Sequence, residues 1–438
     1  MKQVVNRIFI GSLILTAGLL YGCDNIFGAK DNDTTDEIFE EGSIDPSLET
    51  VEGYAPVLPF WGGPDDPEGR FYSPTDVHVG FDRFVYVTDS VGVHLLDRAD
   101  LNPRVTIELD GANAVTQDRL LNVYVSARID TVIESVNPNI TWNLPAVFKF
   151  KNINGAGPLI RVDTLIFPFD DASLSTSAAQ NARLNRSSNV NYEQVEITGV
   201  SALADNSIYI TRRGPFTETN QVAAPDNTVL EFRRVSVNGE FTGKMQNVRQ
   251  IRTLNPITPS LRSAIGLSSV ATFVAPPQRD TFTEDRSFLI AQADQTRDIS
   301  FRVLWINAVE TPDGLVFQQN SQLLAQDTTQ ADGFLYEPDK FQQPTDIAYG
   351  GDDDSYIFVV DAAQHKLYQF QSNGQEGVPP PPGAENQTKQ VLVSFGEFGS
   401  GPKQFKSPSG VAYFNQVVYV ADKGNNRIAR YKLTTDFE

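Results

Sequence analysis

Two segments at opposite ends of the chain align over 18 positions without a gap. They are residues 57–74 (VLPFWGGPDDPEGRFYSP) and residues 391–408 (VLVSFGEFGSGPKQFKSP). Beyond the shared Ser-Pro, each copy continues into two short apolar segments, the second of which ends in aspartate, at Asp89 and Asp422. A third copy runs from residue 341 to Asp361. Internal similarity of this kind predicts that each copy is one supersecondary unit and that the units pack against one another.

The last copy identifies the type of repeat. It has Phe405, then Ser407-Pro408, a strand that ends in Val418-Tyr419-Val420-Ala421-Asp422, and a third strand that begins Asn426-Arg427-Ile428. This pattern resembles the NHL repeat of β-propellers, which implies an all-β fold built of four-stranded blades. Three weaker copies share only the order of strands, at residues 112–150, 197–232 and 265–304. We therefore predict a six-bladed β-propeller over residues 53–438, without long helices.

Each blade needs an outer strand. Five candidates follow the third strands, at residues 104–107, 159–162, 248–251, 315–317 and 391–393. The last copy has no candidate after its third strand, and the ungapped alignment assigns Val57-Leu58 to this position. We therefore expect this N-terminal strand to close the ring, because closure leaves no open edge between the first and last blades.

The N-terminus carries an export signal. Lys2 and Arg7 precede an apolar stretch over residues 8–20, which is shorter than the roughly 20 residues of a membrane span. The sequence Leu20-Tyr21-Gly22-Cys23 then resembles the lipobox of bacterial lipoproteins. This resemblance implies that residues 1–22 are removed and that Cys23 is acylated, which anchors the chain to a bacterial membrane, with the outer membrane or cell surface favoured. The alternative is an ordinary secretory signal with an incidental cysteine.

Residues 23–52 are expected to form a disordered tether. Between Asp24 and Glu49 there are nine acidic residues against Lys30 alone. Such a segment cannot bury enough apolar area to offset the entropy of ordering it. It is either a soluble spacer or a sorting signal behind the acylated cysteine.

Overall charge and residue usage exclude several classes of protein. The chain has 55 Asp and Glu against 35 Lys and Arg, a net charge of −20. This charge repels phosphate backbones, so nucleic acid is not an expected partner. With one Cys and three His, the chain cannot form a disulfide framework or a Cys-rich metal site.

Candidate channel ligands lie where the innermost strands begin. Asp76 and Asp346 follow the repeat Pro by two residues, and Asn113 is taken as the comparable polar residue of the second repeat. Their oxygens would either bind a hard cation such as Ca²⁺ or accept hydrogen bonds at the entry of the strand. Gly199 and Gly410 occupy the same position in two other repeats and interrupt the ring of donors. We therefore predict no cofactor, with Ca²⁺ as the open alternative.

Other polar residues fit structural roles. The strand-end residues Asp89, Asp361 and Asp422 are expected to fix turns by accepting backbone N–H bonds. The run Asp352–Asp354 lacks the spacing of an EF-hand loop and predicts a solvated turn. Some NHL-type propellers hold Zn²⁺ with three inner-strand histidines. Here only His78 is expected on an inner strand, while His94 and His365 belong to third strands. The sequence therefore predicts no zinc site of this kind, and the activity of those zinc-binding propellers is not inferred for this chain.

No catalytic set emerges from these residues. We predict a lipid-anchored binding or scaffold protein of the cell envelope, whose propeller face takes a protein, peptide or glycan and whose only membrane contact is the lipid. The alternative is an enzyme of lyase or lactonase type that uses a divalent cation in the channel, an analogy that rests on the fold alone.

Overall fold

The computed structural model describes residues 53–63, 69–98, 103–133, 140–167, 192–214, 227–251, 266–274, 285–295, 299–320, 333–351, 355–379 and 390–436. All of them belong to one compact unit, Val51–Glu438. The predicted export signal, Cys23, the acidic segment and the Asp352–Asp354 run lie outside the described residues, so the predictions made for them stay predictions.

The described strands fall into four concentric positions. The innermost strands are β3 (Asp76–Val79), β7 (Val115–Gln117), β11 (Glu196–Ala202), β15 (Leu267–Thr272), β19 (Pro344–Tyr349) and β22 (Pro408–Phe414). The second strands are β4 (Val85–Thr88), β8 (Val123–Ile133), β12 (Ile208–Arg213), β16 (Phe288–Gln292), β20 (Ile357–Asp361) and β23 (Val417–Asp422). The third strands are β5 (Gly92–Leu96), β9 (Ile140–Lys151), β13 (Thr228–Val237), β17 (Val303–Thr311), β21 (Lys366–Phe370) and β24 (Arg427–Leu433). The outer strands are β6 (Pro103–Glu108), β10 (Ile160–Ile166), β14 (Glu240–Ile251), β18 (Gly314–Gln319) and, from the N-terminal side, β1 (Tyr54–Pro56) with β2 (Trp61–Gly62).

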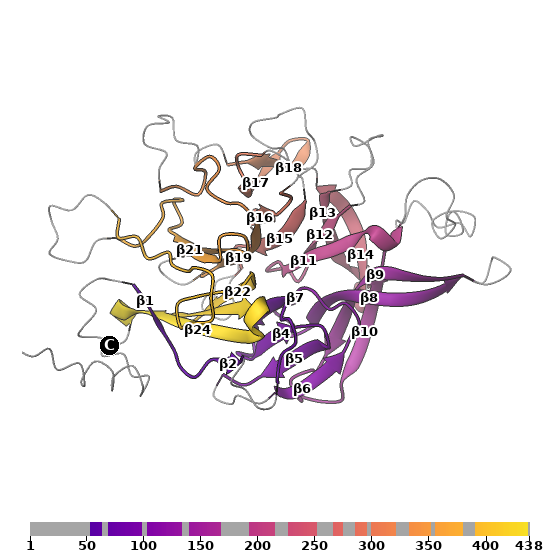
Figure 1. The fold of residues 1–438 in the computed structure, drawn as a ribbon. Helices are drawn as coiled ribbons and strands as arrows, with labels where there is room; N and C mark the ends of the chain where they lie inside the picture. Colours follow the sequence, from indigo (N-terminus) through magenta and orange to yellow (C-terminus); the bar gives the residue numbers. More distant parts are fainter. Residues whose placement is uncertain are drawn as a thin grey trace, which may run out of the picture. The chain divides into compact units, whose positions relative to one another are not determined.

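These strands form a six-bladed β-propeller, which confirms the predicted fold. Within the described residues there are six antiparallel sheets; five run from an innermost to an outer strand, and the sheet β19–β20–β21 ends at its third strand. Each innermost strand contacts the next one around the closed circuit β3–β7–β11–β15–β19–β22–β3, and Figure 1 shows them gathered at the centre. The helices in the same residues are single 3₁₀ turns at Tyr192–Gln194, Lys423–Asn425 and Thr434–Asp436.

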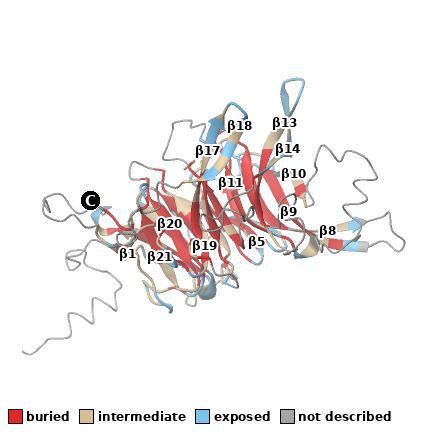
Figure 2. Cartoon of the chain, turned by 90° about the horizontal axis from the view of Figure 1, so that it is seen from above, coloured by how far each residue is buried: buried red, intermediate tan, exposed pale blue. Residues whose placement is uncertain are grey.

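The second strands supply most of the core. Every residue of β4, β16 and β20 is buried, because a blade packs against a neighbour on both faces. An aromatic ring recurs at one position of these strands and exposes at most 3% of its surface, in Tyr86, Tyr124, Tyr209, Phe358 and Tyr419. Figure 2 shows buried residues running through the blades and exposed ones at the hairpin ends. The continuous apolar runs of the sequence therefore correspond to the strand that is covered on both sides.

Closure by an N-terminal strand is confirmed, but the residues that pair differ from those predicted. β1 and β2 both pair antiparallel with β24, so the last blade takes its outer strand from the start of the propeller. The predicted pair Val57-Leu58 lies between the two pairings. Val57 N still donates to Arg430 O at 2.8 Å, whereas Leu58 is 45% exposed and Pro59 has no N–H to donate. The chain leaves the edge of β24 here and returns at Trp61, which is fully buried.

The fifth blade also differs from the prediction. Residues 391–393 form no regular outer strand, and β19, β20 and β21 make a three-stranded sheet. Isolated bridges join Val391 to Val378 and Phe395 to Leu367. The hydroxyl of Ser394 accepts the N–H of Gln369, so a side chain replaces a ladder bond, and the segment pairs with β21 only at the Phe395–Leu367 bridge. Elsewhere the predicted strands shift by a few residues, as at β7, which begins at Val115 rather than Ala112.

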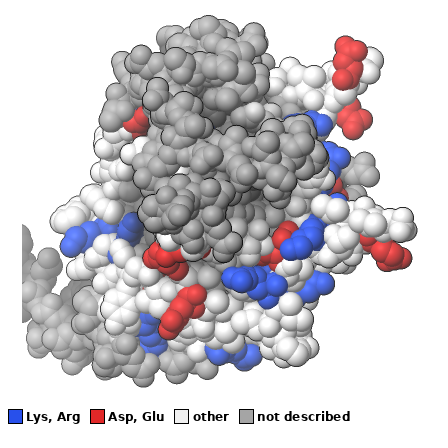
Figure 3. Space-filling model, turned by 90° about the vertical axis from the view of Figure 1, so that its right-hand side faces the viewer, with Lys and Arg blue, Asp and Glu red and all other residues white. Residues whose placement is uncertain are grey.

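The rim of the propeller carries charges of both signs. On the described part of the face in Figure 3, basic and acidic side chains lie interspersed. Several of them pair, as Lys244 does with Asp163 at 2.8 Å between β14 and β10. None of the helices in the part of the chain that the structure describes is long and apolar enough to span a membrane.

Candidate functional site

A closed circuit of hydrogen bonds joins the six blades where the innermost strands begin. In each blade one short polar side chain donates to a main-chain carbonyl of the next blade. The six bonds are Thr75 to Ala112 (3.2 Å), Asn113 to Ile197 (3.1 Å), Thr198 to Leu267 (2.8 Å), Ser268 to Pro344 (2.7 Å), Thr345 to Pro408 (2.8 Å) and Ser409 to Pro74 (2.7 Å). We call these six donors the entry ring. The entry ring fixes the position of each blade on its neighbour at one end of the channel.

Local strand geometry aims these donors. In four blades the register between the innermost and second strands shifts at the donor, as between Pro344 and Asp346 or between Pro408 and Gly410. A β-bulge leaves one residue unpaired and redirects its side chain. The bulged residue is Thr198, Ser268, Thr345 or Ser409, each small enough to reach the adjacent carbonyl.

The residue after each donor faces the channel, and here the blades differ. These positions hold Asp76, Ala114, Gly199, Ser269, Asp346 and Gly410. A Cβ at Gly410 would lie 2.7 Å from Asp76 Cα, and one at Gly199 would lie 2.9 Å from Val270 N. Glycine is therefore needed at these two places because the adjacent backbones approach closely. The carboxyls are left at blades 1 and 5.

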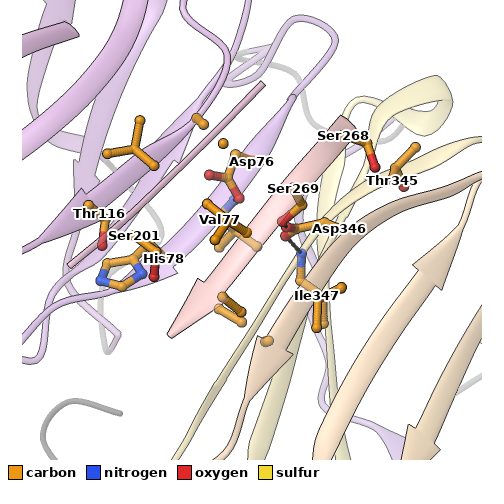
Figure 4. Close-up of a pocket in the computed structure, with 18 of the residues that line it drawn as sticks. Asp76, Val77, His78, Thr116, Ser201, Ser268, Ser269, Thr345, Asp346 and Ile347 are labelled. Atoms are coloured by element: carbon orange, nitrogen blue, oxygen red, sulfur yellow. Dashed lines mark hydrogen bonds between the residues drawn. The ribbon is translucent and has the colours of Figure 1, made fainter. Parts of the chain in front are cut away.

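Asp76 and Asp346 come together in the channel. Asp76 accepts Val77 N at 2.7 Å and Val115 N of the second blade at 2.8 Å. Asp346 accepts Val411 N of the sixth blade at 2.7 Å and the Ser269 hydroxyl of the fourth. Figure 4 shows Asp76, Ser269 and Asp346 converging from three blades.

Both carboxyls have pKa values above those of an ordinary aspartate. Burial raises the pKa of Asp76 well above its ordinary value, and the charge of Asp346 raises it further. Burial also raises the pKa of Asp346, to about 6, although hydrogen bonds from Ser269 and from the backbone N–H groups of Val411 and Ile347 oppose the shift. The sequence predicted that these carboxyls would bind a cation or accept hydrogen bonds at the entry of the strand. The structure shows that their hydrogen-bond donors include groups of neighbouring blades.

His78 lies two residues further along β3 and lines the same cavity, beside Thr116 and Ser201 (Figure 4). Burial lowers the pKa of His78 to about 4, and the charge of Asp82 only partly opposes this. The imidazole is therefore neutral at physiological pH. Its Nε2 atom is buried and has no hydrogen-bond partner in the structure.

The cavity has a volume of about 320 Å³ and is bounded by all six innermost strands. These strands run in the same direction, so residues at their starts gather at one end and residues about four positions later at the other. The first end carries the entry ring and the carboxyls. The second end is apolar and aromatic, with Val79, Val274, Tyr349 and Tyr413 in its wall. The Tyr349 ring meets Phe273 edge-on at 5.0 Å, and Tyr413 stacks on Phe358 at 5.0 Å.

The sequence anticipated part of this site. Asp76, Asn113 and Asp346 all line the cavity. Asn113, however, belongs to the entry ring and corresponds to Thr75, so the residue equivalent to Asp76 is Ala114. Ser269 and Ser201 were missed because their repeats match only in strand order. An alignment of all six strand starts would have shown the signal, a short hydroxyl or amide side chain one residue after the repeat Pro position.

The strand-end aspartates fix turns, as predicted. Asp361 accepts four backbone N–H groups, from Gln342, Gln343, Ala363 and Gln364. Asp89 accepts the N–H groups of Tyr72, Val91 and Gly92 and pairs with His94 Nε2 at 2.9 Å. Asp422 accepts Lys406 N and the Arg427 guanidinium.

The histidines are dispersed as predicted. His94 lies on the third strand β5, and His365 precedes β21 and accepts Ser407 N. Among the described residues no group of three or more His, Cys, Asp or Glu side chains is placed to hold a metal ion. Arg213 and Lys423 are the cations in the described wall of the cavity, and Arg213 is paired with Glu196.

Fold and site together define a six-bladed β-propeller with a carboxyl pair inside its channel. The NHL repeat family matches residues 405–431, which include β22, β23 and most of β24. Comparison with curated proteins gives no match.

Solved structures with a similar course of the chain include three propeller-sized proteins. A protein of unknown function from Bacteroides thetaiotaomicron is 16% identical, with a TM-score of 0.45, over 87% of this chain and 76% of that one. An auxiliary nutrient binding protein from Bacteroides ovatus is 10% identical, with a TM-score of 0.43, over 87% and 77%. A streptogramin B lyase is 11% identical, with a TM-score of 0.40, over 87% and 98%.

Proposed function

We propose that this protein is a lipid-anchored binding protein of the bacterial cell envelope and that its propeller takes a small ligand into the central channel. The observation that carries the binding role is the cavity of about 320 Å³ between the innermost strands. Its volume lies at the lower end of the range for small-molecule sites. The entry ring holds the mouth in a fixed shape, and preorganisation of this kind lowers the entropic cost of binding.

The anchor is proposed from Leu20-Tyr21-Gly22-Cys23 and from the acidic segment that follows. A single acyl chain binds membranes only marginally, whereas the two or more chains of a lipoprotein cysteine hold a protein stably. The acidic segment would then separate the propeller from the membrane surface, at the outer membrane or the cell surface.

Replacing Cys23 with Ser tests the anchor. We expect Cys23→Ser to move the protein from the membrane fraction to the soluble fraction, because the modified residue carries the lipid. Ser43→Ala, in the same segment, serves as the control and should stay with the membrane. Membrane association of Cys23→Ser as strong as that of the unchanged chain would contradict the proposal.

Cysteine labelling tests the channel. Cys23 is the only cysteine, so in the Cys23→Ser background an introduced thiol is unique. The Ser201→Cys protein is labelled with a bulky thiol reagent after folding and is then exposed to native envelope extract. We expect the labelled protein to fail to retain small molecules that the unlabelled protein retains. Mass spectrometry of the denatured protein detects them. Ser236→Cys, on the exposed part of β13, is the matched control. If both labelled proteins retain the same compounds, the channel is not the binding site.

An enzyme that uses a divalent cation in the channel is the second candidate, and the carboxyl pair favours it. Ca²⁺ takes six or more oxygen ligands, however, and Asp76, Asp346 and Ser269 offer fewer unengaged oxygens. We therefore expect added Ca²⁺ to give no saturable rise in melting temperature, and the unchanged chain and the Asp346→Asn variant should not differ in this respect.

A further inference from the structure

The cavity combines a carboxyl end with an apolar end, and no described cation neutralises the carboxyls directly. Asp76 and Asp346 have hydrogen-bond donors from Val115, Val411 and Ser269, all of them neutral groups. Arg213 is engaged with Glu196, and Lys423 is exposed on a 3₁₀ turn. Among the described residues, the pair is thus held by neutral hydrogen-bond donors.

We propose that the channel ligand is a primary amine with a short apolar or aromatic body, whose ammonium group donates hydrogen bonds to Asp76 and Asp346. This inference rests on the proposed binding function and names its ligand class. An ammonium has three N–H donors, and the pair together with the Ser269 hydroxyl presents acceptor oxygens from three blades. Charge-assisted hydrogen bonds of this kind are about twice as strong as neutral ones. The body of the ligand then extends along the strands toward Val79, Val274 and Tyr349.

His78 gives an independent indication that the channel is built for a ligand. Its Nε2 atom is buried without a partner, which is costly unless a guest supplies the hydrogen bond. The ring lies between the carboxyl end and the apolar end, beside Thr116 and Ser201. A polar atom on the body of the ligand would reach this nitrogen while the ammonium reaches the carboxyls.

The raised pKa of Asp346 should make binding of an ammonium group dependent on pH. The groups that face the pair are His78 on β3 and the cavity-lining Arg213 and Lys423. His78 is neutral above pH about 4 and does not change charge in the relevant range. Binding of the amine should therefore release about one proton near pH 6 and strengthen as the pH rises through the pKa of Asp346.

The test uses the full chain with 2-phenylethylammonium as the probe and 2-phenylethanol as its neutral counterpart. We expect the amine, and not the alcohol, to raise the melting temperature saturably, with proton release measured by calorimetry in two buffers of different ionisation enthalpy. Asp346→Asn and Ser269→Ala should each weaken amine binding, the former by at least about tenfold. Asp97→Asn, which removes the same charge on the rim beside Arg104, should leave it unchanged.

Each other outcome overturns the ligand class. The proposed ligand class is overturned if the amine does not bind, or if amine and alcohol bind equally. It is also overturned if a folded Asp346→Asn protein binds the amine as tightly as the unchanged chain does. A saturable stabilisation by Ca²⁺ that Asp346→Asn abolishes would assign the pair to a divalent cation instead. Failure of the proposed binding function would be recognised by a different result. In that case the labelled Ser201→Cys protein would retain the same envelope compounds as the labelled Ser236→Cys control.

Discussion

The same side chain behaves differently at two places in this propeller. At the end of a second strand, Asp89 is buried, but hydrogen bonds from His94 and from Tyr72 N outweigh the cost of burial and hold its pKa below the ordinary value. At the start of an innermost strand, burial dominates for Asp76 and Asp346, and the proximity of two carboxyls adds to it. At Asp89 the hydrogen-bond donors therefore outweigh burial, whereas at Asp76 and Asp346 burial outweighs the donors.

The channel groups should affect stability in opposite directions as pH changes. The pKa of Asp346 is raised from 3.8 to about 6, so its contribution to stability is complete below pH 3.8 and is lost as pH rises through 6. The pKa of His78 is lowered from 6.5 to about 4, so its contribution is complete above pH 6.5 and is lost as pH falls through 4. Between pH 7 and 4, protonation linked to His78 should lower the free energy of unfolding by about 3 kcal/mol, and we expect His78→Gln to abolish this decrease.

Asp346→Asn should change the same pH profile with the opposite sign. It removes a group that stabilises the folded state on acidification, so the variant should lose more stability than the unchanged chain between pH 7 and 4. Urea unfolding at several pH values measures both effects. If both variants shifted the profile in one direction, the assigned pKa changes would be wrong.

At the scale of elements, the entry ring shows how a bulge turns a strand end into an inter-blade contact. Hydrophobic packing is not directional, so it cannot by itself fix how far one blade slides along the next. A hydroxyl that must reach one carbonyl fixes the position of the blade along its neighbour, because hydrogen bonds weaken steeply with distance and angle. Residues that look like ordinary turn-formers in the sequence thus set the alignment of whole sheets.

Thr198→Val should destabilise the protein by about 1–3 kcal/mol, since valine keeps the shape but leaves the Leu267 carbonyl without its donor. Thr242→Val, at the exposed end of the β13–β14 hairpin, removes a hydrogen bond to Val235 O and should cost much less. Denaturant unfolding gives the comparison. Equal losses of stability would show that the entry ring does not align the blades.

At the scale of the whole molecule, two independent devices close the ring. The entry ring joins the sixth blade to the first through Ser409 and Pro74 at the channel. At the rim, β1 and β2 supply the outer strand of the last blade. Trp61 fixes this strand by burying its indole against Tyr419, with ring centroids 5.7 Å apart. Ring closure therefore does not depend on one contact.

Truncation separates the rim closure from the segment before it. Deleting residues 24–50 should leave the melting temperature nearly unchanged, because the N-terminal pairing with the last blade, in the part of the chain that the structure describes, begins at Gly53. Deleting residues 24–62 should cost several kcal/mol, because it removes β1 and β2 and buries no substitute for Trp61. Melting temperatures that agree between the two truncations would refute closure by the N-terminal strand.

The sequence by itself determined the all-β class, the six units and the origin of the closing strand, because these depend on apolar patterns and turn residues that recur along the chain. It also placed Asp76 and Asp346 at strand starts. Tertiary structure alone decided that Val57-Leu58 is skipped between β1 and β2, that Asn113 belongs to the entry ring, and that the fifth blade closes without a regular outer strand. It alone brought Ser269 into the cavity, whereas His78 was already expected on an inner strand. The physical reason is that these features depend on distances between blades, and residues such as Asp346 and Ser269, 77 positions apart, carry no local signal of the contact they make.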